Sequence, residues 1–245
     1  MLKHRDFVGM LVTMHQSGTH WVKHILTSAI YHEEGFEQPK SIYDEDRFIG
    51  NPKSHRGRPG VPSITASHSI PHILLGSQLL HRMVTFPKYV ILVRDIRACL
   101  VSNYEKWKPS CGFSEYLHGD VRGKRFNSDI WWCIRFYNAW GRVLENVPDK
   151  ATLIRYESMK EDTYTEFSKL VDFMGLEISR ESIEFAINFS GKETMAKRQN
   201  PDDLQVVRKD NRPLEEWFSE EDMQFYMETC RRYLKYDMGY TNDCL

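Results

Sequence analysis

The 245-residue sequence predicts an α/β domain in which a central parallel β-sheet is flanked by helices on both faces. Three observations carry this prediction. Short apolar runs alternate with longer segments of helical periodicity. The run at 88–93 is almost continuously apolar and β-branched, as in a central parallel strand. A glycine-containing loop at 14–19 joins the first apolar run to a helix, which gives the first half of a βαβ unit.

The predicted elements follow one another without a repeat, a low-complexity tract or a linker, so residues 1–245 are expected to form a single domain. Strands are predicted at 7–13, 61–66, 88–93 and 151–156. Helices are predicted at about 20–31, 72–83, 95–107, 129–146, 163–174, from 179 onward, and 219–236. The segments 33–60 and 108–127 are expected to be loops, and 190–212 shows only weak periodicity.

Capping residues support several of these helix boundaries. Asp95, Ser179 and Ser219 each stand at the start of a predicted helix and are residue types that cap helix N-termini. Ser219 is followed three residues later by Asp222, which resembles a capping box. Gly175 is expected to end the helix at 163–174.

Charge and cysteine usage argue against several classes of function. The formal net charge is −1, without the basic excess that nucleic-acid binding requires, and no apolar run is long enough to span a bilayer. Five irregularly spaced cysteines without a CxxC pair argue against a disulfide framework or a zinc site: Cys99, Cys111, Cys133, Cys230 and Cys244. With no signal-peptide pattern, we expect a cytoplasmic protein without nucleic-acid, membrane or metal partners.

The loop after the first strand has the sequence MHQSGTHW at 14–21. A glycine loop that opens a helix presents backbone N–H groups and the positive end of the helix dipole, and this geometry binds phosphate. It is not a Walker A loop, because Thr19 rather than lysine follows Gly18. On the loop alone, an ordinary turn between a strand and a helix is an equal alternative.

The same segment resembles the 5′-phosphosulfate loop of the cytosolic sulfotransferases, in which an aromatic residue precedes P-K-S-G-T-T-W. Ser17, Gly18, Thr19 and Trp21 match that pattern. The resemblance implies a P-loop-like nucleotide-binding fold and a sulfuryl donor, 3′-phosphoadenosine 5′-phosphosulfate (PAPS). It also implies that the loop amides, including that of His20, hold the 5′-phosphate and that Trp21 packs on the adenine.

The segment 93–104 resembles the 3′-phosphate segment of the same family, in which a strand ends in arginine and a serine follows eight residues later. Arg94 and Ser102 take these positions. Arg94 is expected at the carboxyl end of a central strand, where α/β sheets bind ligands. A guanidinium fork together with a hydroxyl suits a dianionic phosphate. The alternative is that Arg94 only pairs with Asp95 in an ordinary βα unit.

The segment 65–71 resembles the family's K-T-H-L-P sequence, whose histidine is the general base. His68 takes that position, directly after a predicted strand. A hydroxyl acceptor attacks well only when a base takes its proton, and histidine suits this task near neutral pH. Alternatively, His68 is a turn residue that is hydrogen-bonded to the backbone.

Two further segments complete the resemblance. Tyr156 stands in a strand end similar to the family's R-Y-E segment, where the tyrosine contacts adenine; plain packing is an equal alternative. Arg208 and Lys209 match an R-K-G segment that closes on the 3′-phosphate, although Asp210 replaces the glycine; a solvated charge run is the alternative. Ser190 aligns loosely with an adenine-contacting hydroxyl.

Two expected cations are missing. Gln16 replaces the loop lysine that contacts the sulfuryl group in the family, and we therefore assign Gln16 to the catalytic set as a neutral donor. Ala66 replaces a second lysine near the general base. Either another cation substitutes, or the enzyme is slow, or the chain binds nucleotide without turnover. The candidate substitutes are Lys23, Lys53, Arg56 and Arg58.

The order of these segments implies a sulfotransferase that moves a sulfuryl group from PAPS to a hydroxyl or amine of a small-molecule acceptor, releases PAP and needs no metal. A weak or silent PAP- or PAPS-binding protein is the alternative, and a P-loop-like kinase is disfavoured because a Walker A lysine is absent. Loop aromatics suggest a flat or apolar acceptor: Tyr43, Phe48, Trp107, Phe113 and Tyr116. Asp44, Glu45 and Asp46 would instead suit a cationic one, and a homodimer is left open.

Overall fold

The computed structural model describes residues 7–39, 48–52, 58–197 and 212–240. Within them a single four-stranded sheet has the order β2-β1-β3-β4, and every neighbouring pair of strands is parallel. The strands are β1 (Gly9–Thr13), β2 (Ile64–Ser67), β3 (Lys88–Val93) and β4 (Ala151–Arg155). The parallel sheet of the sequence prediction is therefore confirmed.

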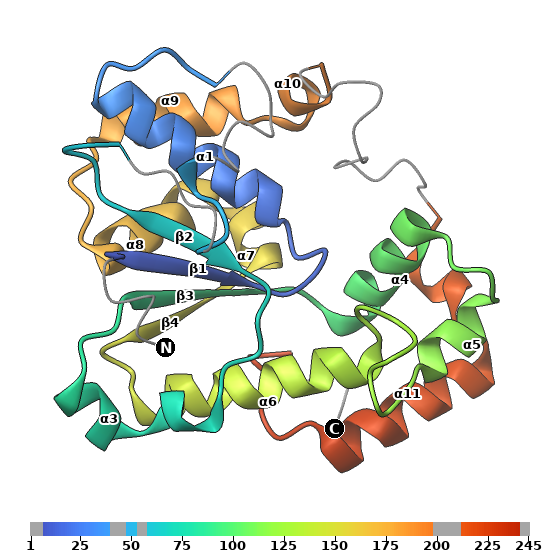
Figure 1. Cartoon of the computed structure of the whole chain (residues 1–245). Helices are drawn as coiled ribbons and strands as arrows, with labels where there is room; N and C mark the ends of the chain where they lie inside the picture. The colour runs from blue at the N-terminus through green and yellow to red at the C-terminus, as the bar shows by residue number, and fades with distance from the viewer. Residues whose placement is uncertain (1–6, 40–47, 53–57, 198–211, 241–245) are drawn as a thin grey trace.

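Helices cover both faces of the sheet, as Figure 1 shows. The α-helices are α1 (Thr19–Glu33), α3 (Gln78–Met83), α4 (Ile96–Trp107), α5 (Phe113–His118), α6 (Ile130–Asn146), α7 (Tyr156–Glu161), α8 (Thr163–Met174), α9 (Arg180–Phe189), α10 (Lys192–Lys197) and α11 (Glu220–Tyr233). Two short 3₁₀ helices are η2 (Ile73–Gly76) and η3 (Leu214–Trp217). None of the helices in the described part of the chain combines the length and the apolar character needed to cross a bilayer.

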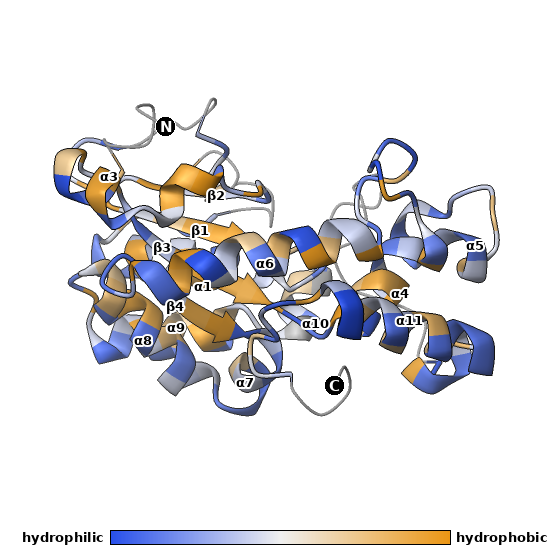
Figure 2. Ribbon diagram, turned by 90° about the horizontal axis from the view of Figure 1, so that it is seen from below, coloured by the Kyte–Doolittle hydropathy of each residue, from blue (hydrophilic) through white to orange (hydrophobic). Residues whose placement is uncertain are grey.

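Alternation along the strands divides the core into two layers. Leu11, Val90 and Leu92 pack under α1, α8 and α9, whereas Val12 and Ile91 pack against α6 on the opposite face. Both layers are closely buried, and Figure 2 shows the hydrophobic strands between helices whose outer faces carry hydrophilic residues. Packing on both faces thus holds the sheet rigid. The residues that follow the carboxyl ends of its strands are therefore held in fixed positions.

Helix capping follows the sequence prediction at several helix starts. The Asp95 carboxylate accepts a hydrogen bond from the Ala98 amide at 3.0 Å and begins α4. Ser219 and Asp222 form the expected capping box at the start of α11, which ends at Tyr233, three residues before the predicted end. Gly175 ends α8 in the left-handed conformation, as expected.

Other boundaries differ from the prediction for local reasons. The segment 72–83 is not one helix, because Ser77 caps α3 and separates it from η2. The segment 108–127 is not wholly a loop, since α5 forms where Tyr116 and Leu117 are buried against the core. The second strand begins after Pro62, which has no N–H to give to the sheet.

Candidate active site

Four neighbouring strands each deliver a predicted site residue to the same edge of the sheet. β1 leads into the loop 14–18, β2 ends one residue before His68, β3 one residue before Arg94, and β4 one residue before Tyr156. Because all four strands are parallel, their carboxyl ends share this edge. The site is therefore assembled from the first residue or loop after each strand.

The loop 14–18 is shaped to open α1. The Ser17 hydroxyl is buried and donates a hydrogen bond to the Met14 carbonyl oxygen at 2.7 Å. Gln16 and Gly18 both have positive φ angles, 62° and 90°, and no side chain caps the start of the helix at Thr19. Successive amides at an uncapped helix start form an anion-binding concavity, which is the geometry a phosphate needs.

Arg94 joins this loop to α4. Its Nη1 donates to the Gln16 carbonyl oxygen at 3.0 Å and lies 3.3 Å from the Ser102 hydroxyl. Its Nε is buried and has no hydrogen-bond partner in the described part of the chain. A cationic donor held between two segments, with one N–H unused, matches the requirements of a bound anion.

An aromatic pair lies beside Arg94. The guanidinium carbon of Arg94 is 4.7 Å from the centre of the Tyr156 ring, and Trp21 meets the same ring edge-on at 5.9 Å. Gly18 lies so close that an added Cβ would be 2.7 Å from the Tyr156 ring. The structure thus brings Trp21, Tyr156 and the loop together, as their predicted contacts with one nucleotide require.

His68 is anchored to the end of β1. Its Nδ1 lies 2.9 Å from the Thr13 carbonyl oxygen and 2.9 Å from the Thr13 hydroxyl, which also accepts from Thr19. A carbonyl oxygen can only accept, so Nδ1 carries the ring hydrogen in the neutral imidazole. Nε2 is then the unprotonated nitrogen, and it is the one that can take a proton from an acceptor.

The surroundings keep His68 in this neutral state. Burial is the largest influence and lowers its pKa below the ordinary value of 6.5, while the hydrogen bond to Thr13 acts in the opposite direction. The nearby charges of His20, Lys23 and Lys106 lower the pKa further. A base with a pKa below neutrality is ready to accept a proton at pH 7.

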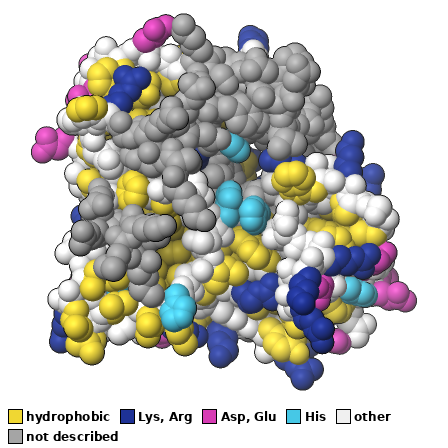
Figure 3. Space-filling view, viewed as in Figure 1, with side chains coloured by type: hydrophobic (Ala, Val, Ile, Leu, Met, Phe, Trp, Pro, Cys, Tyr) yellow, Lys and Arg dark blue, Asp and Glu magenta, His cyan; other side chains and the backbone are white. Residues whose placement is uncertain are grey.

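Sequence reasoning missed a second histidine at this site. The ring of His15 stacks on that of His68 at 4.2 Å between centres and lies 4.6 Å from Trp132 of α6. Burial, followed by the charge of His68, lowers the pKa of His15 to about 3, so it is neutral at physiological pH. Figure 3 shows histidine side chains gathered near the middle of one face, beside hydrophobic side chains.

Of three further predicted nucleotide contacts, the structure describes only Ser190. The Ser190 hydroxyl is buried and lies 2.7 Å from Nδ1 of His24, inside the layer between α1 and α9. Its proposed contact with adenine stays a prediction. Arg208 and Lys209 lie outside the described residues.

The structure describes two of the four cations that could replace the missing lysines. Arg58 lies over the rings of Tyr31 and Phe36, at 4.8 and 4.7 Å. Tyr31 belongs to the last turn of α1, about three helical turns from the phosphate loop, so Arg58 is not the replacement cation. Lys23, which is only 4% exposed, affects the pKa of His68. Lys53 and Arg56 lie outside the described residues.

The expected acceptor-facing aromatics are largely part of the core, which corrects the prediction. Tyr116 is 2% exposed and donates to the Ser128 carbonyl oxygen, and Phe48 is 4% exposed. Phe113 packs in an aromatic cluster with Phe218. Burial against other side chains stabilises large aromatic rings more than exposure to solvent does. Trp107 is half exposed, and Tyr43, Asp44, Glu45 and Asp46 lie outside the described residues.

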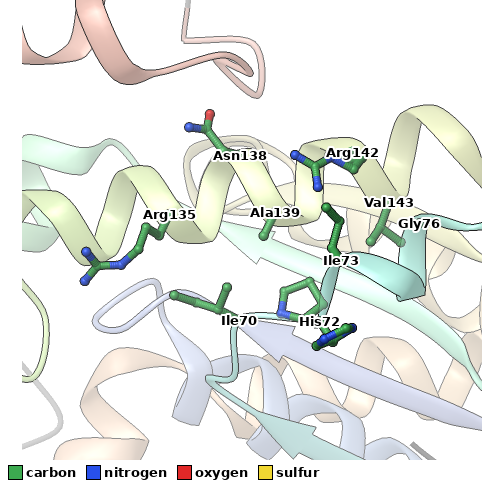
Figure 4. Close-up of a pocket in the computed structure, with 10 residues that line it drawn as sticks. Ile70, His72, Ile73, Gly76, Arg135, Asn138, Ala139, Arg142 and Val143 are labelled. Atoms are coloured by element: carbon green, nitrogen blue, oxygen red, sulfur yellow. The ribbon is translucent and has the colours of Figure 1, made fainter. Parts of the chain in front are cut away.

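A separate cavity of about 260 Å³ lies between α6 and the segment 70–76. Arg135 and Arg142 project from α6 on one side, and Ile70 and His72 lie on the other (Figure 4). Its lining shares no residue with the predicted site. The chemistry described above therefore does not depend on this cavity.

Comparison with known proteins agrees with the geometry. A family model described as the sulfotransferase domain matches residues 9–203. Rat sulfotransferase 2A6 is 22% identical over 223 residues, which cover 86% of this chain and 73% of the relative. Rat sulfotransferase 2A1 is 24% identical over 206 residues, which cover 80% of this chain and 68% of the relative.

Solved structures show the same fold. Mouse sulfotransferase SULT7A1 complexed with PAP has a TM-score of 0.63 at 14% identity, covering 95% of this chain and 85% of that chain. Retinol dehydratase in complex with androsterone and inactive cofactor PAP has a TM-score of 0.66 at 16% identity, covering 96% and 83%. Since the family model spans most of the sequence and the fold agrees, this chain belongs to the PAPS-dependent sulfotransferase family.

Proposed function

We propose that the carboxyl edge of the sheet holds PAPS and transfers its sulfuryl group to a hydroxyl or amine of a small-molecule acceptor, releasing PAP. The observation that carries this proposal is the position of Arg94. Its guanidinium bonds to the Gln16 carbonyl oxygen of the phosphate loop and to Ser102 of α4. The two segments expected to hold the two ends of the nucleotide are thus joined through one cation.

PAPS is proposed to be bound at both of its phosphate groups. The amides of residues 17–20 and the Thr19 hydroxyl are proposed to hold the 5′-phosphosulfate at the positive start of α1. Two of these donors also have partners within the chain, since the Ser17 amide donates to the Met14 carbonyl oxygen at 3.3 Å and the Thr19 hydroxyl to the Thr13 hydroxyl at 2.9 Å, so they would turn from these partners to the donor. Arg94 and Ser102 hold the 3′-phosphate, and the unpartnered Nε of Arg94 supports this assignment. Arg208 and Lys209 are proposed to close on the same phosphate.

The adenine is proposed to pack beside two rings. Trp21 and Tyr156 meet edge-on with their ring centres 5.9 Å apart, and the Tyr156 ring lies directly against Gly18, so the purine would contact both rings from outside this pair. Flat aromatic faces stabilise a purine by stacking, which contributes on the order of 1–3 kcal/mol per base. Ser190 keeps its proposed role as a further adenine contact.

His68 acts as the general base. Its Nδ1 hydrogen is held by Thr13, so Nε2 takes the acceptor proton as the acceptor oxygen or nitrogen forms its bond to sulfur. PAPS supplies the sulfuryl group on a good leaving group, because the bond that breaks joins sulfur to a phosphate oxygen. Catalysis then rests on in-line positioning and on stabilising the charge that grows on that oxygen.

The acceptor is proposed to be a small molecule. The retinol dehydratase structure was solved in complex with androsterone, which is a property of that protein and supports the same class of acceptor here. A cytoplasmic location, the absence of a metal requirement, and the absence of nucleic-acid or membrane partners stay predictions, as does a homodimer.

A second candidate function follows from one observation. Gln16 and Ala66 replace two lysines, so the chain could bind PAP or PAPS without turnover. The test is to mix the protein with ³⁵S-labelled PAPS and either 2-naphthol or tyramine, to measure PAP release, and to titrate PAP by calorimetry. PAP release above that of His68→Ala supports the proposed function. PAP binding without release supports the silent protein, and no binding refutes both.

A further inference from the structure

Hydrogen bonds fix one nitrogen of His68 but not the plane of its ring. Its contacts with the carbonyl oxygen and with the hydroxyl of Thr13 both lie at Nδ1. Rotation of a histidine ring about its bond to Cβ is soft, so contacts at one nitrogen leave the ring able to tilt. A base must direct Nε2 at the acceptor proton, and a misplacement of about 1 Å can cost about 100-fold in rate. A second contact is therefore needed to hold the ring plane.

The ring of His15 makes this second contact. The centres of the two imidazole rings are 4.2 Å apart and their planes are inclined by 27°, which is a stacked arrangement. A flat ring at this distance blocks tilting of His68 toward it, because the ring atoms would then overlap. Burial lowers the pKa of His15 to about 3, so the stacked ring places no positive charge beside the base at neutral pH.

His15 is itself held against helix α6. The centre of its ring lies 4.6 Å from that of Trp132, which stacks on Phe136 at 5.1 Å. Phe136 is fully buried, and the Trp132 amide donates to the Asp129 carboxylate at 2.9 Å at the start of the helix. Neither ring nitrogen of His15 has a hydrogen-bond partner in the described part of the chain, so ring contacts hold its side chain. A row of four rings thus connects His68 to the core.

The backbone around His15 is equally well fixed. Met14 and Ser17 are both fully buried, and the Ser17 hydroxyl donates to the Met14 carbonyl oxygen at 2.7 Å. The Met14 amide donates to the Leu92 carbonyl oxygen of β3 at 3.0 Å. The side chain of His15 therefore starts from an anchored loop and ends between two other rings, which is the arrangement of a support for a neighbouring group.

We propose, on the basis that the proposed function holds, that His15 is a positioning residue that keeps the ring of His68 oriented for proton transfer, with Trp132 behind it. Thr13 selects the tautomer of His68, and His15 sets the direction in which Nε2 points. Only the flat face of His15 is used in this role, and neither of its nitrogens. A different flat ring at position 15 can therefore replace it.

The first experiment compares His15→Ala with His15→Phe, by measuring PAP release from ³⁵S-labelled PAPS with 2-naphthol as acceptor. His15→Ala removes the stacked ring and should lower kcat by about tenfold or more. His15→Phe keeps a flat ring and should stay within about threefold of the unaltered protein. The Kd of PAP should stay within about twofold in both variants, because the phosphate contacts lie on other residues, and this measurement also shows that each variant is folded.

The second experiment tests whether His15 acts through His68. In a His68→Ala background there is no base to orient, so adding His15→Ala should change the remaining single-turnover rate by less than about twofold. Two residues that act independently would instead lower the rate by the product of their separate effects. His72→Asn, which alters an exposed histidine beside α6, is the matched control and should behave like the unaltered protein.

The proposal is overturned if His15→Ala keeps its kcat or raises only the KM for the acceptor. It is also overturned if His15→Phe loses as much turnover as His15→Ala, since a ring nitrogen would then be in use, or if the losses multiply in the His68→Ala background. Failure of the proposed function is visible separately, because the unaltered protein would then release no PAP from PAPS.

Discussion

The Nδ1–H of His68 points to the carbonyl oxygen of Thr13 across 2.9 Å. The last residue of β1 therefore fixes the tautomer of the residue that follows β2. Because the acceptor is a backbone oxygen, no carboxylate is needed to orient the ring. The pairing of β1 with β2, in which Val12 lies opposite Ser67, sets this distance. The register between β1 and β2 thus determines the tautomer and the orientation of the proposed base.

Replacing His68 with alanine should abolish most turnover. A positioned general base contributes about 10²–10⁴-fold to the rate, and the acceptor hydroxyl would lose it. The phosphate contacts lie on other residues, so PAP affinity in calorimetry should match that of the unaltered protein. Turnover by His68→Ala at the original rate would remove His68 from its assigned role.

The pH dependence of kcat/KM should reflect the lowered pKa of His68. Burial lowers that pKa below 6.5, so the free base predominates at neutral pH, and activity should fall only when acid protonates Nε2. The acidic limb of a profile of kcat/KM against pH should therefore lie below pH 6.5. A limb centred above pH 7 would mean that a different group is the base.

The stability of the fold should also decrease in acid because of His15. Its pKa is about 3 in the folded chain, against an ordinary value of 6.5, so the unfolded chain binds more protons between these values. The free energy of unfolding then falls as the pH drops below 6.5, by at most about 1.4 kcal/mol per pH unit. Between pH 7.5 and 5.5, urea unfolding of His15→Phe should lose about 1 kcal/mol less than that of the unaltered chain.

An exposed histidine provides the control for this measurement. His72→Asn keeps a side-chain acceptor for the Leu74 amide and should leave the acid sensitivity of the unaltered chain in place. Equal acid sensitivity in His15→Phe and in the unaltered chain would show that His15 titrates as an ordinary surface histidine.

Ser102→Ala should weaken PAP binding selectively. A hydrogen bond to a charged group contributes about 1.5–3 kcal/mol, which corresponds to about a tenfold or larger rise in the Kd of PAP. Adenosine 5′-monophosphate lacks the 3′-phosphate, so its Kd should be unchanged in the same calorimetric titration. A parallel loss for both nucleotides would indicate that Ser102 supports the fold of α4 and not the 3′-phosphate.

The strand ends and capped helices were accessible from sequence, because they depend on local signals. Parallel strands bring their carboxyl ends together, so short apolar runs were enough to group His68 with Arg94. Asp95 and Ser219 carry their capping chemistry within three residues. The resemblance to a family then gave these positions their proposed roles.

The remaining site residues were not accessible in this way, because their contacts are tertiary. His15 stands where the family has proline, so the motif suggested no role, and its stacking on His68 depends on the pairing of β1 with β2. The helix α5 has only six residues and is held by the burial of Tyr116.

Gly18 offers a test of how tightly the loop and Tyr156 are coupled. Its φ of 90° is strained for any other residue, and an added Cβ would lie 2.7 Å from the Tyr156 ring. Gly18→Ala should therefore lower the free energy of unfolding by about 1–3 kcal/mol and weaken PAP binding, as seen in urea unfolding and calorimetry.

The two causes can be separated, because only the clash involves the Tyr156 ring. In a background of Tyr156→Ala the contact disappears while the backbone strain remains, so adding Gly18→Ala should cost about 1–2 kcal/mol and less than it does alone. A double-mutant cycle, which compares the unaltered chain, the two single variants and the double variant, measures this difference directly as a coupling energy. Strict additivity of the two substitutions would mean that Tyr156 does not limit the approach to the loop, and the proposed adenine site beside Trp21 and Tyr156 would lose its main structural support.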